Sequence, residues 1–413
     1  MTATAVIATV LLQATLSIWL IHRQIVAAGT RRSTVPEVFR ETVDVPAREQ
    51  AADLMIARMR AARIAAVTTA LATLALSLGG GVAMIDQGWQ TASLSPILHG
   101  TAVIASVLVI QQLVIALNAA WRVFISEAAF RVNRMTPMLF IGDVLKRILL
   151  HGVWLIPLLV ASLAIFDDIG IWWWLPAWFG WLAVEIVRTT IAPHTIAPIF
   201  NRFTPLPDDG LRRKIESVLA MYGLRADALL VMDGSRRSAM GNASCTAFGR
   251  SARIVVLDTL MARLDAAELE AVLTHEIGHL ALGHHHRRLI ADGAAMLLAL
   301  ALLTMLLQLP GTLASFAIDE ASLHNTLALA AVLLPVIRFY AAPLLNRMAR
   351  QQELEADDFA ARNSSTGATA DALMKIHRDN RAELDPDPLW WNFFASHPAP
   401  IERLTRLASR HTA

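Results

Sequence analysis

Cysteine and charge are both scarce in this 413-residue chain, and each scarcity excludes a class of protein. The single cysteine, Cys245, rules out a disulfide within the chain and a metal site built from several thiolates. Charged residues make up 17% of the sequence, against roughly 25% in soluble globular proteins. The formal net charge of +2 is too small for a basic nucleic-acid-binding surface, so we expect no nucleic-acid partner.

Long hydrophobic runs are what the chain has in abundance. Seven of them approach or exceed the length of about 20 residues that an α-helix needs to cross a bilayer. They lie at roughly 3–21, 64–85, 97–119, 148–166, 169–187, 289–309 and 326–343. The sequence therefore predicts an α-helical integral membrane protein of seven transmembrane helices, with the lipid bilayer as a partner.

The segments between these runs divide by charge. The loops near 86–96, 167–168 and 310–325 contain acidic residues and no Lys or Arg, namely Asp86, Asp167, Asp168, Asp319 and Glu320. Almost every basic residue lies in the other set of segments, which the positive-inside rule places in the cytoplasm. We expect the N-terminus outside, and the segment 188–288 and the C-terminus in the cytoplasm. The Ala- and Arg-rich composition favours a bacterial inner membrane.

Some charged or ionisable residues lie inside the predicted spans, among them Glu185, Arg338, His99 and His151. Glu185 and Arg338 are each near the cytoplasmic end of their helix, and we expect them to form an ion pair between the fifth and seventh spans. His99 and His151 lie in the third and fourth spans, where hydrogen-bonded packing is the expected role.

The segment His275-Glu276-Ile277-Gly278-His279 predicts a zinc site. On a helix, histidines four residues apart project from one face and can bind one Zn²⁺. Glu276 lies between them, within reach of a water on the metal, and is the predicted general base. Asp265 and Glu268 predict the start of that helix, as an N-cap followed by a carboxylate three residues on.

A catalytic zinc takes three protein ligands, and two residues compete for the third position. His285 lies six residues after His279, but the spacing used by metzincins also requires Gly at 282, where this chain has Leu. Glu353 is the stronger candidate, because it lies on another predicted helix, 344–362, on the same side of the membrane. Asp357 shares its face and can hold a ligand histidine through the other ring nitrogen.

The rest of the soluble part is predicted to be a small α+β unit. A helix is expected over 211–222, ended by Gly223, with short strands at 229–232 and 253–257. We divide the chain into an N-terminal membrane domain of five helices, 1–187, and a cytoplasmic protease segment, 188–288. Transmembrane helices six and seven follow at 289–343, and a C-terminal segment at 344–413 supplies the third ligand and substrate contacts.

These features, in this order, resemble one family. The chain is similar over nearly its whole length to the type I CaaX prenyl endopeptidases, integral-membrane zinc metalloproteases of the gluzincin type. Besides the His-Glu motif, the residues that carry the resemblance are the segments 35–39, 130–137, 196–207, 232–238, 353–357, 385–389, 396–398 and 402–403.

The resemblance implies a ring of seven helices around a large water-filled chamber, with one zinc per chain held by His275, His279 and Glu353. It implies that Glu276 is the general base and that His397 and Arg403 contact the substrate or its oxyanion. It also implies that the segment opened by Asn242, Ala243 and Ser244 pairs with the substrate backbone as an added strand.

Three positions depart from the family pattern. The usual Asn-Ala-Tyr-Phe is here Asn242-Ala243-Ser244-Cys245, and Arg131 replaces a usual Gly.

The expected function is hydrolysis of peptide bonds near the C-terminus of prenylated CaaX-type substrates, and the substrate is a peptide or protein with or without a prenyl group. The alternatives are a membrane-protein quality-control zinc protease of loose specificity and a catalytically silent seven-helix scaffold.

Overall fold

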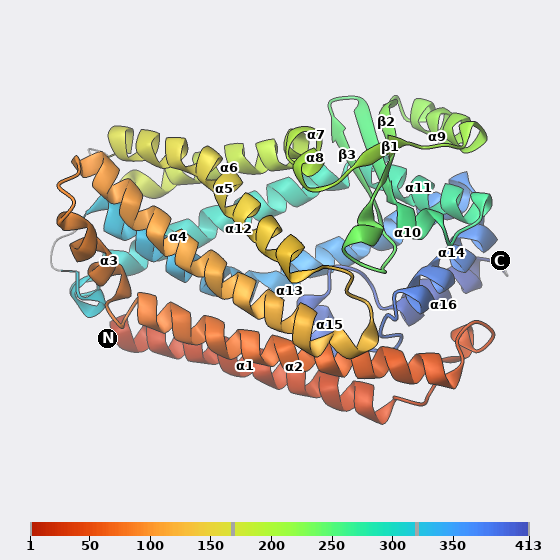
Figure 1. The fold of residues 1–413 in the computed structure, drawn as a ribbon, viewed down its shortest axis with the longest axis horizontal. Helices are drawn as coiled ribbons and strands as arrows, with labels where there is room; N and C mark the ends of the chain where they lie inside the picture. The colour runs from red at the N-terminus through yellow and green to blue at the C-terminus, as the bar shows by residue number, and fades with distance from the viewer. Residues whose placement is uncertain (1, 167–169, 319–321, 412–413) are drawn as a thin grey trace.

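The structure is a computed structural model that describes residues 2–166, 170–318 and 322–411. Asp167, Asp168, Asp319 and Glu320, which the charge argument used, lie outside these ranges. Long helices fill most of the molecule, and a small sheet with short helices covers one end of them (Figure 1).

Six helices in the described ranges are long and apolar enough to cross a membrane. They are α1 (Thr2–Thr30), α2 (Val45–Leu76), α4 (Pro96–Trp121, continued to Ser126 by a π-helical turn), α5 (Pro137–Phe166), α12 (His284–Leu307) and α13 (Leu323–Asn363). The fifth predicted span, 169–187, corresponds to the shorter α6 (Trp174–Thr190). The predicted fold class is confirmed, apart from this difference between seven long helices and six.

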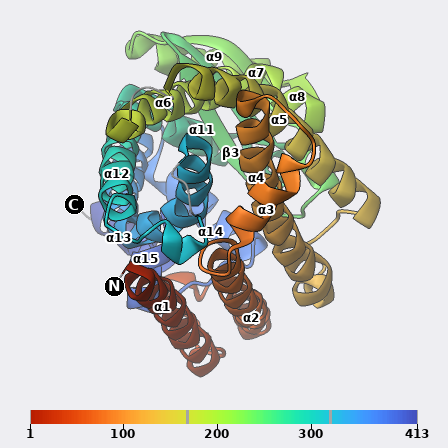
Figure 2. The ribbon, with the colours of Figure 1, turned by 90° about the vertical axis from the view of Figure 1, so that its left-hand side faces the viewer.

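The membrane helices are arranged as a ring (Figure 2). Going around the ring, α4 packs on α5, α5 on α6, α6 on α12 and α12 on α13. The ring closes where α13 packs on α4. The paired helices α1 and α2 flank the ring beside α13 and α4. This arrangement agrees with the ring of helices that the family resemblance implies.

A proline is accommodated at one helix contact of the ring. Pro335 lies inside α13 and has no N–H to donate to the carbonyl of Ala331, four residues earlier. The side-chain amide of Gln111, on α4, donates to that carbonyl at 3.0 Å. The neighbouring helix thus supplies the hydrogen bond that proline removes.

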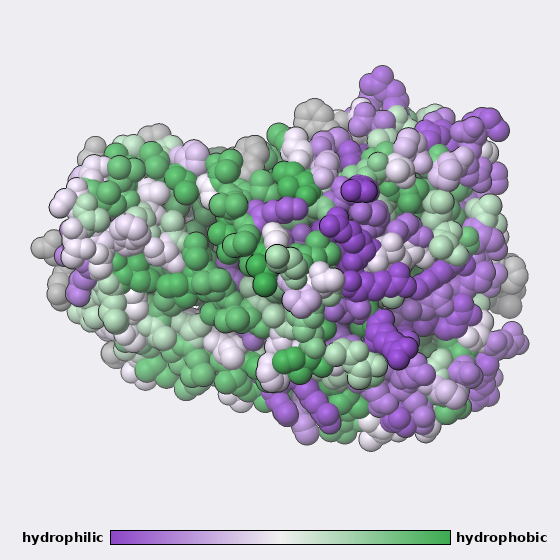
Figure 3. Space-filling view, viewed as in Figure 1, coloured by the Kyte–Doolittle hydropathy of each residue, from purple (hydrophilic) through white to green (hydrophobic). Residues whose placement is uncertain are grey.

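The outer surface of these helices is strongly apolar. Large apolar side chains are exposed along them, including Leu12, Leu71, Leu117, Leu149 and Met305. The hydrophobic surface covers the part of the molecule built from long helices, and hydrophilic residues gather over the sheet and the C-terminal helices (Figure 3). A soluble protein would not expose this much contiguous apolar surface, so the chain is a multi-pass membrane protein.

One predicted ion pair differs from the structure. Glu185 pairs with Arg188 on its own helix, and Arg338 lies 3.9 Å from Asp292 of α12, so the expected pair between Glu185 and Arg338 is wrong. The boundaries proposed at 288/289 and 343/344 fall inside the continuous helices α12 and α13.

The predicted strands are found in a four-stranded sheet. The strands are β1 (Phe203–Pro205), β2 (Arg225–Met232), β3 (Ala243–Phe248) and β4 (Ser251–Leu257), in the order β1-β2-β4-β3. Only β2 and β4 run parallel, and β3 pairs antiparallel with β4 alone. β3 is therefore an edge strand. The predicted helix over 211–222 is α9 (Asp209–Met221), followed by Gly223 at φ +69°.

Shorter helices lie at both ends of the molecule. One of them, α3 (Gly81–Gln90), lies at the end opposite the sheet. The soluble end contains α7 (Ala192–Thr195), α8 (Ala197–Phe200), α10 (Asp258–Met261), α11 (Ala266–Ala281), α14 (Thr366–Asp379), α15 (Pro388–Phe394) and α16 (Pro400–His411). The sheet and α9 pack against α11, whose buried face is lined by Leu269, Leu273 and Ile277. This core fixes the helix that carries the His-Glu motif.

Candidate metal centre

Helix α11 begins at the capping box that its sequence predicts. Asp265 accepts hydrogen bonds from the N–H groups of Ala267 and Glu268, and the Glu268 carboxylate accepts one from the N–H of Asp265. This capping box is the predicted one. Gly278 allows α13 to approach, since a Cβ there would lie 3.1 Å from the Phe359 side chain. The glycine of the motif is thus a packing requirement.

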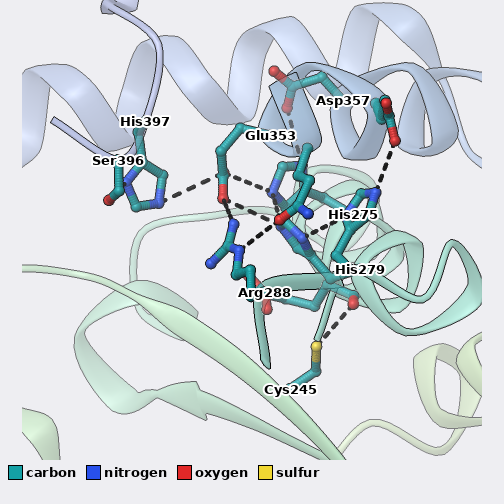
Figure 4. A network of polar contacts seen from close by, with 12 residues as sticks. Cys245, His275, His279, Arg288, Glu353, Asp357, Ser396 and His397 are labelled. Carbon is teal, nitrogen blue, oxygen red and sulfur yellow. Dashed lines mark hydrogen bonds and ion pairs between the residues drawn. The ribbon is translucent and has the colours of Figure 1, made fainter. Parts of the chain in front are cut away.

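His275, His279 and Glu353 meet between α11 and α13 (Figure 4). The Nε2 atoms of the two histidines are 3.3 Å apart. Oε2 of Glu353 lies 3.5 Å from Nε2 of His275, and Oε1 lies 3.5 Å from Nε2 of His279. With Zn–N bonds of about 2.05 Å, tetrahedral ligand atoms are roughly 3.3 Å apart, so this donor set fits zinc. His285 is outside the group.

The Nδ1 atoms of both histidines have partners of their own. Nδ1 of His275 lies 2.9 Å from Oδ1 of Asp357, the partner expected for a ligand histidine. Nδ1 of His279 lies 2.9 Å from Nδ1 of His284. These contacts orient both Nε2 atoms toward Glu353.

In the sequence, the run His284-His285-His286 followed by Arg287 and Arg288 is typical of a basic collar at the membrane surface. For His284 that prediction is wrong. Its side chain is 1% exposed, and its Nε2 lies 3.0 Å from Glu355. Gly283, at φ +68°, ends α11 with a left-handed turn and starts α12 in a new direction. That turn brings His284 back to His279, which an unbroken helix would not do. Gly283 is the residue in the sequence that could have predicted this change of helix direction.

Arg288, from the first turns of α12, also reaches the centre. Its guanidinium donates to Glu353 at 3.3 Å and to the Gln352 side chain at 2.6 Å. Sequence reasoning missed this residue because it was grouped with the surface histidines. A cation beside the Glu353 carboxylate favours its ionised form, which is the form that binds a metal.

Arg403 lies behind the centre. It forms a two-pronged ion pair with Asp357, with distances of 2.8 Å and 2.5 Å, and the pair is buried. Its hydrogen bonds are directed at Asp357, which in turn holds His275. This geometry fits a positioning role for Arg403, and because Arg403 also lines the cleft, the direct substrate contact that the resemblance implies stays a prediction.

His397 approaches from the C-terminal segment. Its Nε2 lies 3.5 Å from a Glu353 oxygen, and its own carbonyl accepts a hydrogen bond from the Trp391 indole at 2.7 Å. The side chain is largely exposed to the cleft beside the centre. It is placed to contact a bound molecule.

The cleft holds about 450 Å³ and is lined on one side by the edge strand. Asn242, Ala243, Ser244 and Cys245 all line it, together with Glu276 and His397. Cys245 is buried, and its thiol donates to the carbonyl of Glu276 at 2.8 Å. That contact joins β3 to α11 directly beside the centre.

Burial shifts the pKa values of the α11 side chains. Burial raises the pKa of Glu276, which makes it a stronger base than an ordinary glutamate. Burial opposes the charged form of His275, but hydrogen bonds to Asp357 and Glu353 outweigh it and raise its pKa to about 9. Burial and the neighbouring His275 charge lower the pKa of His279 to about 3. In the metal-free centre His275 is therefore the charged imidazolium and His279 the neutral imidazole.

Comparisons with known proteins agree with this geometry. The model of the CAAX prenyl protease N-terminal domain, with five membrane helices, matches residues 24–202, and the model of peptidase family M48 matches residues 205–411. The latter is a family of zinc metallopeptidases.

Curated relatives and a solved structure extend the match. A rice protein (Oryza sativa subsp. japonica) named CAAX prenyl protease 1 homolog is 31% identical over 312 residues, covering 75% of this chain and 73% of the relative. The homolog of that name from Arabidopsis thaliana is 30% identical, covering 75% and 73%. The crystal structure of S. mikatae Ste24p has the same fold, with a TM-score of 0.87, 24% identity and coverage of 98% and 99%. The chain therefore belongs to peptidase family M48, as a membrane metalloprotease similar to the CAAX prenyl protease 1 homologues.

Proposed function

We propose that this chain is a zinc endopeptidase that cleaves prenylated CaaX-type proteins near their C-terminus. The observation that carries the proposal is the meeting of His275, His279 and Glu353 beside the free edge of β3, in one cleft. The printed names of the relatives support the substrate class.

In this proposal His275, His279 and Glu353 hold one zinc. When bound, zinc supplies Lewis acidity, which acidifies a coordinated water and polarises a carbonyl. Asp357 fixes the tautomer of His275 through Nδ1, and Arg403 fixes Asp357. The ion pair keeps Asp357 ionised, so that His275 presents its Nε2 lone pair to the metal.

Glu276 performs the proton transfers. It takes a proton from the attacking water and delivers it to the leaving amine. His397 donates a hydrogen bond from the other side of the cleft to the developing oxyanion. The backbone of Asn242 to Ser244 aligns the substrate as an additional strand of the sheet.

The cleavage experiment uses the full-length protein in detergent and two peptides that differ only in a farnesyl group on the CaaX cysteine. We expect release of the terminal tripeptide from the farnesylated peptide at the higher rate, loss of cleavage with a chelator and recovery with Zn²⁺. Mass spectrometry maps the cut sites. Equal cleavage of both peptides at scattered positions would support the protease of loose specificity instead.

The Glu276→Gln variant tests the general base. The amide cannot accept the proton, so we expect kcat to fall by about 10²–10⁴-fold while the zinc content stays unchanged. Cleavage at the wild-type rate by zinc-replete Glu276→Gln protein would remove Glu276 from the mechanism.

We also propose that the metal centre and the C-terminus face the cytoplasm, because Lys and Arg gather in the segments on that side. A reporter enzyme fused after Ala413 tests this orientation. A reporter active only outside the cytoplasm would contradict it. The curated relatives reported above are eukaryotic, and the bacterial source remains a prediction from composition.

A further inference from the structure

Three side chains meet at the end of the molecule opposite the catalytic centre. Asp86 comes from α3, His99 from the first turn of α4 and His324 from the first turn of α13. Asp86 Oδ1 lies 2.5 Å from Nε2 of His99 and 3.1 Å from Nε2 of His324. We propose that Asp86, His99 and His324 form a second zinc site, which joins the ends of three helices.

The donor atoms suit zinc. Two imidazole nitrogens and one carboxylate oxygen lie within 4.8 Å of one another, and in the described part of the chain only this group and the catalytic one do so. Tetrahedral zinc separates its ligand atoms by roughly 3.3 Å. The pair of Asp86 and His324 is already near that value, and the pair of Asp86 and His99 has to open by roughly 0.8 Å.

The surroundings allow that adjustment and a fourth ligand. The side chains of His99, Asp86 and His324 are 14%, 16% and 21% exposed, so water reaches the group. Three protein ligands then leave one position for water.

The neighbouring residue Asn325 adds a second, independent observation. Its side-chain amide donates to Asp86 Oδ2 at 3.2 Å and so orients the carboxylate toward the histidines. Asn325 is 4% exposed, and its Oδ1 is buried with no hydrogen-bond partner among the described residues. A buried acceptor without a donor is costly, which points to a bound donor such as water beside Asn325.

The backbone is also shaped to bring the two histidines together. Gly100 follows His99, and a Cβ at this position would lie 2.7 Å from Cβ of His324 and 3.0 Å from the side chain of Leu163. Only glycine allows α4 and α13 to approach this closely. The ring planes of His99 and His324 meet edge to face, with centroids 5.3 Å apart.

A zinc ion here would cross-link the ends of three helices. It would join α3 to α4 and to α13, the helix that also carries Glu353. His324 and Glu353 are 29 positions apart in α13, which at 1.5 Å per residue separates them by roughly 44 Å. The second site would thus fix the far end of the helix that supplies a ligand to the catalytic centre. The inference does not depend on the proposed substrate.

The test counts zinc in the full-length protein. The purified protein is stripped with a chelator, reloaded with Zn²⁺, desalted and analysed by mass spectrometry of the metal. We expect two zinc ions per chain in the wild type and one in His99→Gln and in Asp86→Asn, which keep a hydrogen-bonding side chain but are poorer ligands. His151→Gln changes a histidine outside both groups and should retain two.

The catalytic zinc serves as the folding control. A His99→Gln protein that keeps one zinc and still cleaves peptide is folded and has lost only the second ion. The double variant His275→Ala/His279→Ala should also bind one zinc, and Zn²⁺ should raise its Tm, an effect that disappears when His99→Gln is added. One zinc in the wild type, or two in His99→Gln, would overturn the proposal and leave a hydrogen-bonded cluster only.

Discussion

At the residue scale, the fold moves the pKa values of the two ligand histidines in opposite directions. An ordinary histidine is mostly neutral at neutral pH, but hydrogen bonds to Asp357 and Glu353 outweigh burial and raise the pKa of His275 to about 9. The same centre keeps His279 neutral, because burial and the His275 charge lower its pKa to about 3. One histidine is thus ready to bind a metal, and the other must first lose a proton.

Zinc uptake should therefore release a proton. Below the His275 pKa of about 9, we expect the apparent zinc affinity of the catalytic centre to fall by about tenfold for each unit decrease in pH. Isothermal titration calorimetry at several pH values, in buffers of different ionisation enthalpy, measures both the affinity and the proton count. The His275→Ala/His279→Ala protein gives the background from other zinc sites. An affinity that does not change between about pH 6.5 and 8.5 would contradict a protonated His275.

Arg403 is the second residue-scale case. Its buried ion pair with Asp357 suggests that it acts through His275. We expect Arg403→Leu to weaken zinc binding by about 10–100-fold, the range for residues that support a ligand. If Arg403 instead contacts the substrate, as the family resemblance implies, the variant should raise KM and leave zinc affinity unchanged.

At the element scale, β3 is the part of the sheet that can accept a substrate. The N–H of Leu257 donates to the carbonyl of Asn242 at 2.9 Å, and β3 is antiparallel to β4. Hydrogen-bonded and non-hydrogen-bonded pairs alternate in such a ladder. Ser244 and Thr246 therefore bond to β4, while the backbone groups of Ala243, Cys245 and Ala247 face the open edge.

Proline substitutions can separate the open edge from the sheet itself. Ala243→Pro removes one outward N–H beside the cleft, and we expect KM to rise by roughly fivefold, corresponding to about 1 kcal/mol for one hydrogen bond. Ala247→Pro removes an equivalent N–H outside the residues that line the cleft. Steady-state kinetics of both variants should show the effect only in Ala243→Pro. Equal effects would mean that the strand does not pair with substrate.

At the scale of the whole molecule, the C-terminal segment is held to the N-terminal helices. Phe39 and Val43 pack against Leu373, Leu384, Leu404 and Leu407 in a separate core. Within this region Arg48 of α2 and Glu383 form an ion pair at 2.6 Å, and both side chains are 0% exposed. The two ends of the chain are joined at a buried contact.

Breaking this pair should destabilise the protein as a whole. Glu383→Ala leaves a buried guanidinium without its partner, which costs about 3–5 kcal/mol. Thermal unfolding in detergent should show a clear decrease in Tm. Arg32→Ala is the matched control, because Arg32 pairs with Asp53 and Glu49 at a partly exposed site, where an ion pair contributes about 0–1 kcal/mol. Similar Tm values for the two variants would show that the buried pair does not stabilise the fold.

What the sequence determined by itself is local. The membrane spans follow from runs of apolar residues, α11 from its capping box and helical spacing, and β2 and β4 from short apolar runs. The His-Glu motif predicts a metal site because residues four apart on a helix share a face. Glu353 was reached through the spacing to Asp357 and the family resemblance. Each of these signals lies within a few residues of the chain or in the order of motifs along it.

The tertiary structure alone decided which distant side chains meet. Asp357 and Arg403 are 46 positions apart, and Asp86 and His324 are 238 apart. Nothing local in the sequence connects them, because the pairing depends on how helices pack. The role of His284 depended on one left-handed residue, Gly283, that redirects a helix. From the sequence, His99 is expected to be a packing histidine. Gly100 allows α4 and α13 to approach each other, and His99 therefore lies beside Asp86 and His324.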